Sequence, residues 1–132
     1  MLNIAMMDAD TYIKYGLSVY FNSKGINVMA ASNISDLTVN LRSNEIDVVV
    51  MELFSRDNDV FECIEFVRSF SSKWPRSKLV IYTQVANEDA VKLLISVTGQ
   101  KEIVYKTDSM HALASCVFSP WKGSLTCFNM AH

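Results

Sequence analysis

The segment Ile46-Asp-Val-Val-Val-Met-Glu52 decides the fold of this chain. Five of its seven residues are apolar, three of them are β-branched valines in a row, and the run ends abruptly at an acidic residue. A continuous apolar run of this length is typical of a strand covered on both faces, as in a parallel sheet. In open α/β sheets, ligand and regulatory sites lie beyond the carboxyl ends of the strands. Glu52 is therefore the first candidate for a functional residue.

On both sides of this segment, short apolar runs alternate with stretches in which apolar residues recur at helical spacing. The runs expected as strands cover residues 2–7, 26–31, 46–51, 79–82 and 103–105. A helical stretch follows each of them. Five strands alternating with five helices predict an α/β domain of the (βα)5 type, with a doubly wound parallel five-stranded sheet, right-handed crossovers and a flavodoxin-like fold.

Polar residues, glycine and proline mark the ends of the expected helices. The candidate N-caps are Asp10 or Thr11, then Ser32, Asn33 or Ser35, then Asn87, and finally Thr107 or Asp108. Gly99 is expected to end the fourth helix and Pro120 the last. The side chains expected to face the core are Phe61, Ile64, Val67 and Phe70 in the third helix, and Met110, Leu113, Ala114, Val117 and Phe118 in the last.

Composition narrows the class of protein. The chain has 132 residues, half of them hydrophobic, and a formal net charge of −2 with acidic and basic residues interspersed. It therefore offers no basic field for nucleic acid or a membrane surface. Three cysteines without a CxxC pair, and a start that lacks a signal-peptide pattern, predict a cytoplasmic protein. No apolar run approaches the ~18 residues of a membrane span, so we expect no membrane contact.

Polar side chains follow four of the expected strands. Asp8 comes after the first, Glu52 after the third, Thr83 after the fourth and Lys106 after the fifth. Because the carboxyl ends of parallel strands meet at one edge of a sheet, we expect these four residues to form one pocket. The first strand-to-helix turn contains no glycine, which argues against flavin or dinucleotide binding, and we expect no cofactor.

The order and spacing of these residues resemble the receiver domain of bacterial two-component response regulators. The resemblance covers roughly residues 1–119, and the run Trp74-Pro-Arg-Ser-Lys-Leu-Val-Ile-Tyr-Thr83 contributes to it. It implies a CheY-like fold, with residues 120–132 as a linker or tail. In a working receiver an acidic pair holds Mg²⁺, an aspartate accepts a phosphoryl group, and a threonine and a lysine contact that group.

This chain departs from the receiver pattern where the chemistry takes place. Ala9 replaces the second acid of the pair, and Glu52 stands at the position of the acceptor aspartate. One extra methylene places the Glu52 carboxylate about 1.5 Å further out, toward the phosphoryl position. Phe54-Ser-Arg56 replaces the usual methionine–proline signature, and Ile103 replaces the aromatic switch. We therefore expect a pseudo-receiver that binds no metal and has no enzymatic activity.

The opening Met7-Asp-Ala-Asp-Thr-Tyr-Ile-Lys-Tyr-Gly-Leu17 resembles LuxR-type (NarL/FixJ) regulators, and most of all the auxiliary regulators of the Rcs capsule-synthesis phosphorelay. That resemblance implies regulation of transcription through a homodimer, or a heterodimer with another response regulator. DNA would be bound only by a C-terminal domain, of the helix-turn-helix kind, outside this sequence. The dimer face of receivers maps here to the fourth helix, fifth strand and fifth helix, with Val91, Ile95, Lys101 and Met110 as candidates.

Several alternatives remain open at the level of the sequence. Glu52 and Lys106 form either an ion pair that permanently imitates the phosphorylated state or a solvated pair without a regulatory role. Thr83 is either a switch or an ordinary strand-end hydroxyl. The chain is alternatively a stand-alone adaptor that binds a kinase or response regulator, or a receiver that still accepts phosphate on Asp8 or Asp10.

Overall fold

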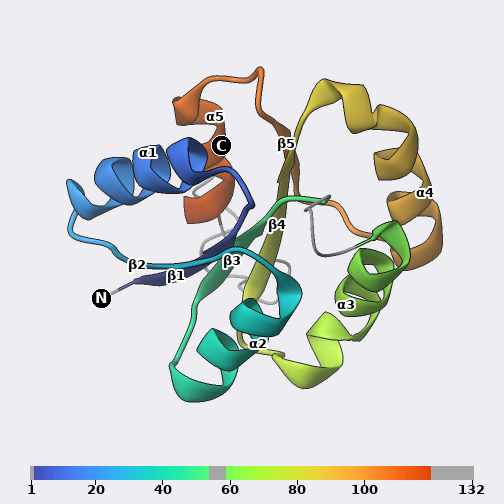
Figure 1. Cartoon of the computed structure of the whole chain (residues 1–132), viewed down its shortest axis with the longest axis horizontal. Helices are drawn as coiled ribbons and strands as arrows, with labels where there is room; N and C mark the ends of the chain where they lie inside the picture. Colours follow the sequence, from blue (N-terminus) through green and yellow to red (C-terminus); the bar gives the residue numbers. More distant parts are fainter. Residues whose placement is uncertain (1, 54–58, 120–132) are drawn as a thin grey trace.

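The computed structural model describes residues 2–53 and 59–119 (Figure 1). The strands are β1 (Asn3–Met7), β2 (Asn27–Ala31), β3 (Val48–Met51), β4 (Lys78–Thr83) and β5 (Ile103–Tyr105). The helices are α1 (Thr11–Asn22), α2 (Ile34–Ser43), α3 (Val60–Lys73), α4 (Glu88–Thr98) and α5 (Met110–Phe118), with a short 3₁₀ turn η1 (Val85–Asn87) before α4. The predicted tail at 120–132 and the signature positions 54–56 lie outside the described residues.

All five strands are parallel and pair in the order β2-β1-β3-β4-β5. The predicted central strand, β3, therefore lies in the middle of the sheet, between β1 and β4. Helices α1 and α5 cover one face of the sheet, and α2, α3 and α4 cover the other (Figure 1). The predicted doubly wound (βα)5 architecture is confirmed.

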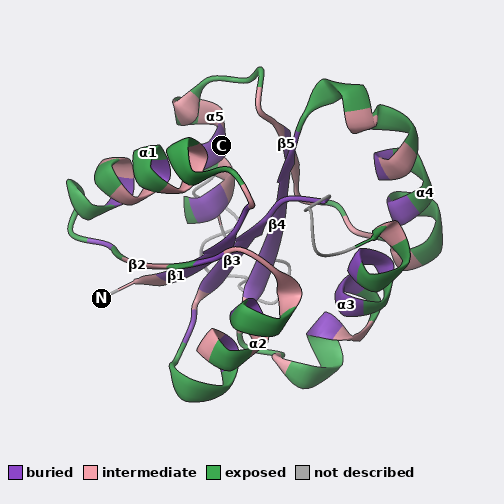
Figure 2. Cartoon of the chain, in the orientation of Figure 1, coloured by how far each residue is buried: buried purple, intermediate pink, exposed green. Residues whose placement is uncertain are grey.

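Alternation along the buried strands divides the core into two layers. In β3, Val49 and Met51 pack against α2, α3 and α4, whereas Val48 and Val50 pack against α1 and α5. Figure 2 shows the same arrangement, with a sheet buried throughout its centre and helices buried only along their inner stripes. A strand enclosed on both faces needs apolar residues at every position, which explains the unbroken valine run.

Side-chain caps begin four of the five described α-helices. Asp10, Asn33, Asp59 and Ser109 each accept hydrogen bonds from backbone amides in the first turn of α1, α2, α3 and α5. The predicted cap of α5 at Thr107 or Asp108 is wrong, because the Asp108 carboxylate accepts from Tyr105 N instead. Gly99 follows α4 with φ 74°, the left-handed conformation that glycine adopts without a Cβ penalty.

Two aromatic residues predicted to face the core are exposed. Phe61 is 72% exposed because the buried stripe of α3 passes through Cys63, Phe66 and Phe70 and leaves the first turn outside. Phe118, the last residue of α5, is 49% exposed and meets the ring of Phe21 edge-on. No helix in residues 2–53 and 59–119 combines the length and apolar character needed to cross a membrane.

Candidate functional site: a closed charge network at the strand ends

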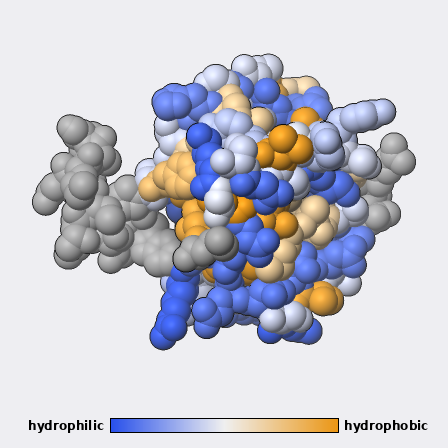
Figure 3. Space-filling view, turned by 90° about the vertical axis from the view of Figure 1, so that its left-hand side faces the viewer, coloured by the Kyte–Doolittle hydropathy of each residue, from blue (hydrophilic) through white to orange (hydrophobic). Residues whose placement is uncertain are grey.

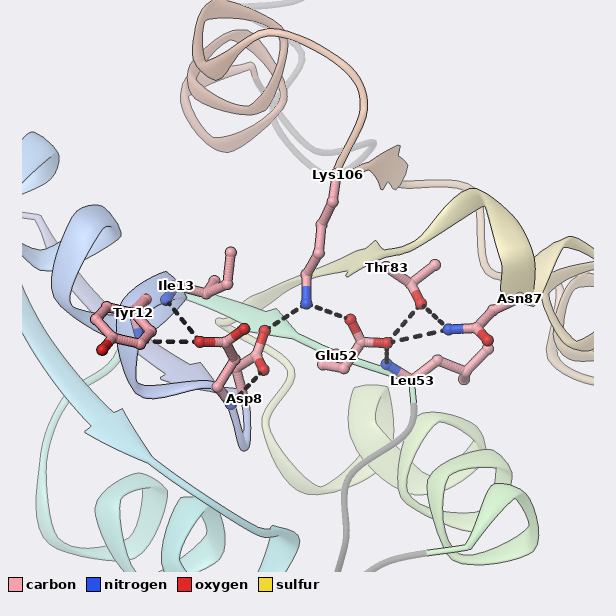
Figure 4. Close-up of polar contacts among 9 residues, drawn as sticks. Asp8, Tyr12, Ile13, Glu52, Leu53, Thr83, Asn87 and Lys106 are labelled. Carbon is pink, nitrogen blue, oxygen red and sulfur yellow. Dashed lines mark hydrogen bonds and ion pairs between the residues drawn. The ribbon is translucent and has the colours of Figure 1, made fainter.

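The four strand-end residues meet in one pocket (Figure 4). Backbone bonds align the ends of the strands, since Glu52 N donates to Met7 O at 2.9 Å and Lys106 N donates to Thr83 O at 2.7 Å. Asp8, Glu52 and Thr83 are buried, and Lys106 enters the pocket from the end of β5 with its side chain only 12% exposed. The structure therefore brings together the four residues that the sequence led us to expect at one edge of the sheet.

Lys106 lies between the two carboxylates. Its Nζ is 2.6 Å from Asp8 Oδ2 and 2.6 Å from Glu52 Oε2. Burial by itself lowers the pKa of Lys106, but its hydrogen bonds and charge attraction to the two acids outweigh burial and raise the pKa above its ordinary value. The lysine is therefore held as a cation, and the predicted Glu52–Lys106 ion pair exists as part of a buried triad rather than as a solvated pair.

The second carboxylate oxygen of Glu52, Oε1, accepts hydrogen bonds from the side away from Lys106. Thr83 Oγ1 donates to Glu52 Oε1 at 2.5 Å, and the backbone amide of Leu53 donates to the same oxygen at 3.0 Å. Charge-assisted hydrogen bonds of this length are the strong ones in proteins. The threonine hydroxyl thus points into the pocket, and Glu52 is fixed between a lysine and a threonine.

Asp8 and Asp10 are engaged in local structure. Asp8 Oδ1 accepts a hydrogen bond from Asp10 N at 2.8 Å, while Oδ2 faces Lys106. The Asp10 carboxylate accepts from Tyr12 N at 2.8 Å and Ile13 N at 3.3 Å, and so caps α1. Asp10 caps α1 instead of facing Lys106, so Asp8 is the aspartate that the described residues place in the pocket.

The residues of the pocket do not fit Mg²⁺, which needs oxygen ligands that are free to coordinate. Both carboxylates of the pocket already face the Lys106 ammonium group, and Ala9 supplies no ligand where the receiver pattern has a second acid. Within the described ranges, no three His, Cys, Asp or Glu side chains form a group that could hold a metal ion.

Two pocket residues were not found from the sequence. Asn87, in the turn before α4, directs its amide toward the pocket, where Nδ2 donates to Thr83 Oγ1 at 2.8 Å. The ring of Tyr82 lies under Lys106, with Nζ 5.7 Å from the ring centroid. The spacing of four residues between Thr83 and Asn87 was the feature of the sequence that could have indicated their contact. The sequence pattern at Asn87 equally favours a helix cap.

The predicted partner face requires one correction. Val91 is 2% exposed and packs with Leu94 in the core, so it cannot contribute to a surface. Of the other predicted residues, Ile95 is 43% exposed, Lys101 is exposed and Met110 is half-buried. The helix turns Val91 inward because α4 needs a buried stripe against the sheet and α3.

A second exposed face lies on α1 and was not predicted. Tyr12, Tyr15 and Val19 are 88%, 71% and 51% exposed, and their spacing of three and four residues places them on one side of the helix. Figure 3 views the side of the molecule that carries α1 and the edge strand β2, where hydrophobic residues gather in the middle of the face. Apolar groupings of this kind often mark contact surfaces.

The chain is similar to known proteins at the level of solved structures. No protein-family model matches the chain, and no curated protein matches it. Among solved structures, it is similar to the signal receiver domain of an HD domain-containing protein from Pseudomonas fluorescens Pf-5, with TM-score 0.76 and 13% identity, covering 99% of this chain and 97% of the other. A two-component response regulator from Clostridium difficile gives TM-score 0.73 and 22% identity, covering 89% and 93%.

The fold is the receiver fold. Full-length FixJ from B. japonicum is also similar, with TM-score 0.73 and 16% identity, and this chain covers 55% of that protein while 87% of this chain is matched. At these identities the likeness establishes the fold. In this chain, Asp8, Glu52, Thr83 and Lys106 lie together at the carboxyl edge of the sheet.

Proposed function

We propose that this chain is a receiver-like regulatory domain that works without phosphorylation and acts by homo- or heterodimerisation. The observation that carries the proposal is the position of the Glu52 carboxylate, which contacts Lys106 on one side and Thr83 on the other. In the receivers that the sequence resembles, a lysine and a threonine make these contacts to the phosphoryl group. A permanent carboxylate in that place supplies the contacts without any modification.

The engagement of the aspartates supports the same proposal. Both oxygens of Asp8 have partners, and Asp10 is used as the cap of α1. A phosphoryl group added to Asp8 would meet Glu52 and would bring at least one further negative charge into a pocket where Lys106 already faces two carboxylates. The proposal assigns the domain no catalytic role and no metal.

Regulation of transcription is the context that we propose for this domain, in the cytoplasm of a bacterial cell. The opening 7–17 resembles LuxR-type regulators, and full-length FixJ is among the similar structures. The Rcs auxiliary regulators remain the sub-family that we favour on sequence. In this proposal, DNA is bound by a separate C-terminal domain outside this sequence, and the receiver-like domain selects the partner.

A phosphodonor experiment tests the proposal. The chain is incubated with acetyl phosphate and Mg²⁺, and intact and peptide masses are measured. We expect no phosphoryl adduct. A matched control is the double variant Ala9→Asp with Glu52→Asp, which rebuilds the receiver pattern of carboxylates and is expected to gain an adduct at position 52. An adduct on Asp8 or Asp10 of the unaltered chain would overturn the proposal in favour of an active receiver.

The adaptor alternative makes a different prediction about assembly. A stand-alone adaptor would sequester a kinase or response regulator as an isolated domain, without being joined to any DNA-binding domain. A domain that works in a transcription regulator would change how its partner binds DNA once it is joined to a DNA-binding domain. Pull-downs with the isolated domain test the adaptor. Gel-shift titrations of the partner, with and without the domain joined to a DNA-binding domain, test the transcription regulator.

A further inference from the structure

Asn87 differs from the residues that begin the other helices. It occupies the N-cap position of α4, yet its side chain makes no hydrogen bond to the first turn of that helix. Asp10, Asn33, Asp59 and Ser109 all make such bonds in α1, α2, α3 and α5. The four capping residues have extended backbones, whereas Asn87 ends η1 with φ −93° and ψ 15°, so its side chain is not placed to cap α4 and is available for contacts at the strand ends.

The Asn87 side chain points into the charge network instead (Figure 4). Its Nδ2 donates to Thr83 Oγ1 at 2.8 Å and approaches Glu52 Oε1 at 3.4 Å. Thr83 donates its own proton to Glu52 Oε1 at 2.5 Å, so the hydroxyl accepts from Asn87 and donates to Glu52 at once. The result is a directional chain of hydrogen bonds from the start of α4 to the carboxylate.

This chain of hydrogen bonds runs from Glu52, which is held in place by other contacts, to Asn87, which lies at the start of α4. Glu52 is held at the end of the central strand by Leu53 N and Lys106. Asn87 directly precedes Glu88, the first residue of α4, and α4 carries the exposed Ile95 of the predicted partner face. The Asn87 amide group therefore joins the Thr83 hydroxyl and the Glu52 carboxylate to the residue that precedes the first turn of α4.

We propose that Asn87 is a positioning residue that couples the Glu52 carboxylate to the placement of α4, and thereby to the partner face. This inference rests on the proposed function, because it explains how a permanent carboxylate would set that face. The Asn87 side chain contacts Thr83 and Glu52 rather than the first turn of α4, so in this inference the start of α4 follows the state of residue 52.

Backbone amide NMR shifts of residues 92–98 test the coupling, because this far half of α4 lies beyond direct contact with residue 52. Spectra are compared for the unaltered chain, Glu52→Gln, Asn87→Ser and the double variant. We expect Glu52→Gln to shift these resonances, and we expect the shifts to be lost in the Asn87→Ser background. Such non-additivity is the mark of a direct link between two residues.

The serine variant separates a positioning role from a capping role. The backbone of residue 87 does not let asparagine or serine cap α4, so Asn87→Ser is expected to leave the protection of the first α4 amides from hydrogen exchange unchanged while it cuts the contact with Thr83. Asn33→Ser is the matched control, because Asn33 caps α2 and has no contact with the pocket. It is expected to leave the α4 response to Glu52→Gln unchanged.

The NMR spectra test the coupling, and the mass measurement tests the proposed function, so the two can fail separately. Equal α4 shifts with and without Asn87, or no shift at all with Glu52→Gln, would overturn the coupling. If Glu52→Gln does not fold, Thr83→Val cuts the same chain of bonds and takes its place in the four spectra. A phosphoryl adduct, measured by mass, would overturn the proposed function while leaving the coupling test readable.

Discussion

At the scale of single residues, Lys106 has the greatest influence on the pocket, because among residues 2–53 and 59–119 it is the cation that pairs with both Asp8 and Glu52. We predict that Lys106→Met destabilises the fold by about 3–5 kcal/mol, the usual effect of removing one partner from a buried ion pair. Urea unfolding followed by circular dichroism measures the change. Methionine keeps most of the volume, so the loss reports on charge.

The control for Lys106 is Lys92→Met on α4. Lys92 also forms an ion pair, with Glu88 at 3.3 Å, but both side chains are more than half exposed. Exposed pairs contribute about 0–1 kcal/mol. A loss in Lys106→Met no larger than that in Lys92→Met would contradict the buried network described here.

A second prediction at this scale concerns alkaline pH. Burial raises the pKa of the Cys63 thiol from 9.0 to about 12, with further contributions from Glu62 and other nearby acids, and Cys63 Sγ donates to Leu53 O. A group with a raised folded-state pKa stabilises the fold fully below its unfolded pKa and loses that contribution as pH rises through the folded pKa. The free energy of unfolding is therefore expected to fall from about pH 9 toward pH 12.

The variant Cys63→Ser removes this titration and keeps a donor for Leu53 O. We expect the slope of stability against pH between about pH 9 and 12 to become shallower in the variant, whatever its absolute stability. Lys106 contributes a decline of the same sign, because its pKa is also raised, so some slope remains. An unchanged slope in denaturant titrations across this range would contradict the assignment to Cys63.

At the scale of helices, replacing two glycines by alanine is expected to change the stability of the protein in opposite directions. Gly16 lies inside α1, exposed, and a Cβ built there meets no atom within 4 Å. Gly16→Ala is expected to stabilise the protein by roughly 0.5–1 kcal/mol, because alanine has less conformational freedom to lose. Gly99→Ala is expected to destabilise it by about 1–2 kcal/mol, since φ 74° is unfavourable for a residue with a Cβ. Thermal unfolding of both variants measures the two signs.

The pair of variants checks the helix boundaries directly. Equal effects at the two positions would mean that α1 is interrupted at Gly16 or that α4 continues past Gly99. A stabilised Gly16→Ala that also loses partner binding would point to α1 as a contact surface, because the new methyl group would stand on the exposed face between Tyr12 and Val19.

At the scale of the whole molecule, the question is which face meets a partner. Ile95 represents the α4 face, and Val19 represents the α1 face, with 43% and 51% exposure. We predict that Ile95→Lys weakens self-association by more than about tenfold, because a charge buried in an interface without a partner is costly. Val19→Lys is expected to leave association unchanged. Light scattering across a range of concentrations measures both.

The reverse result would move the partner face to α1. A chain that stays monomeric at every concentration would exclude the homodimer, and the same two variants would then be compared in binding to another response regulator. Either result is interpretable, since the two positions lie on helices that cover opposite faces of the sheet (Figure 1).

The pocket could be predicted because its residues end strands. Asp8, Glu52, Thr83 and Lys106 each follow an apolar run, and parallel strands bring their carboxyl ends together wherever the sheet forms. Asn87 could not be assigned in the same way, because an asparagine before a helical stretch is equally suited to a cap and to a distant contact. Whether the Asn87 side chain caps α4 or contacts the pocket depends on the position of Thr83 in the folded structure.

The sequence by itself determined the alternation of strands and helices, the central position of β3 and the replacement of the acceptor aspartate by Glu52, since hydrophobic period and residue identity are local properties. Tertiary structure alone decided that Lys106 pairs with both acids and that Val91 is buried while Phe61 is exposed. The physical reason is that burial and ion pairing depend on which elements pack together, and a helical period does not specify which of its apolar residues the neighbouring elements cover.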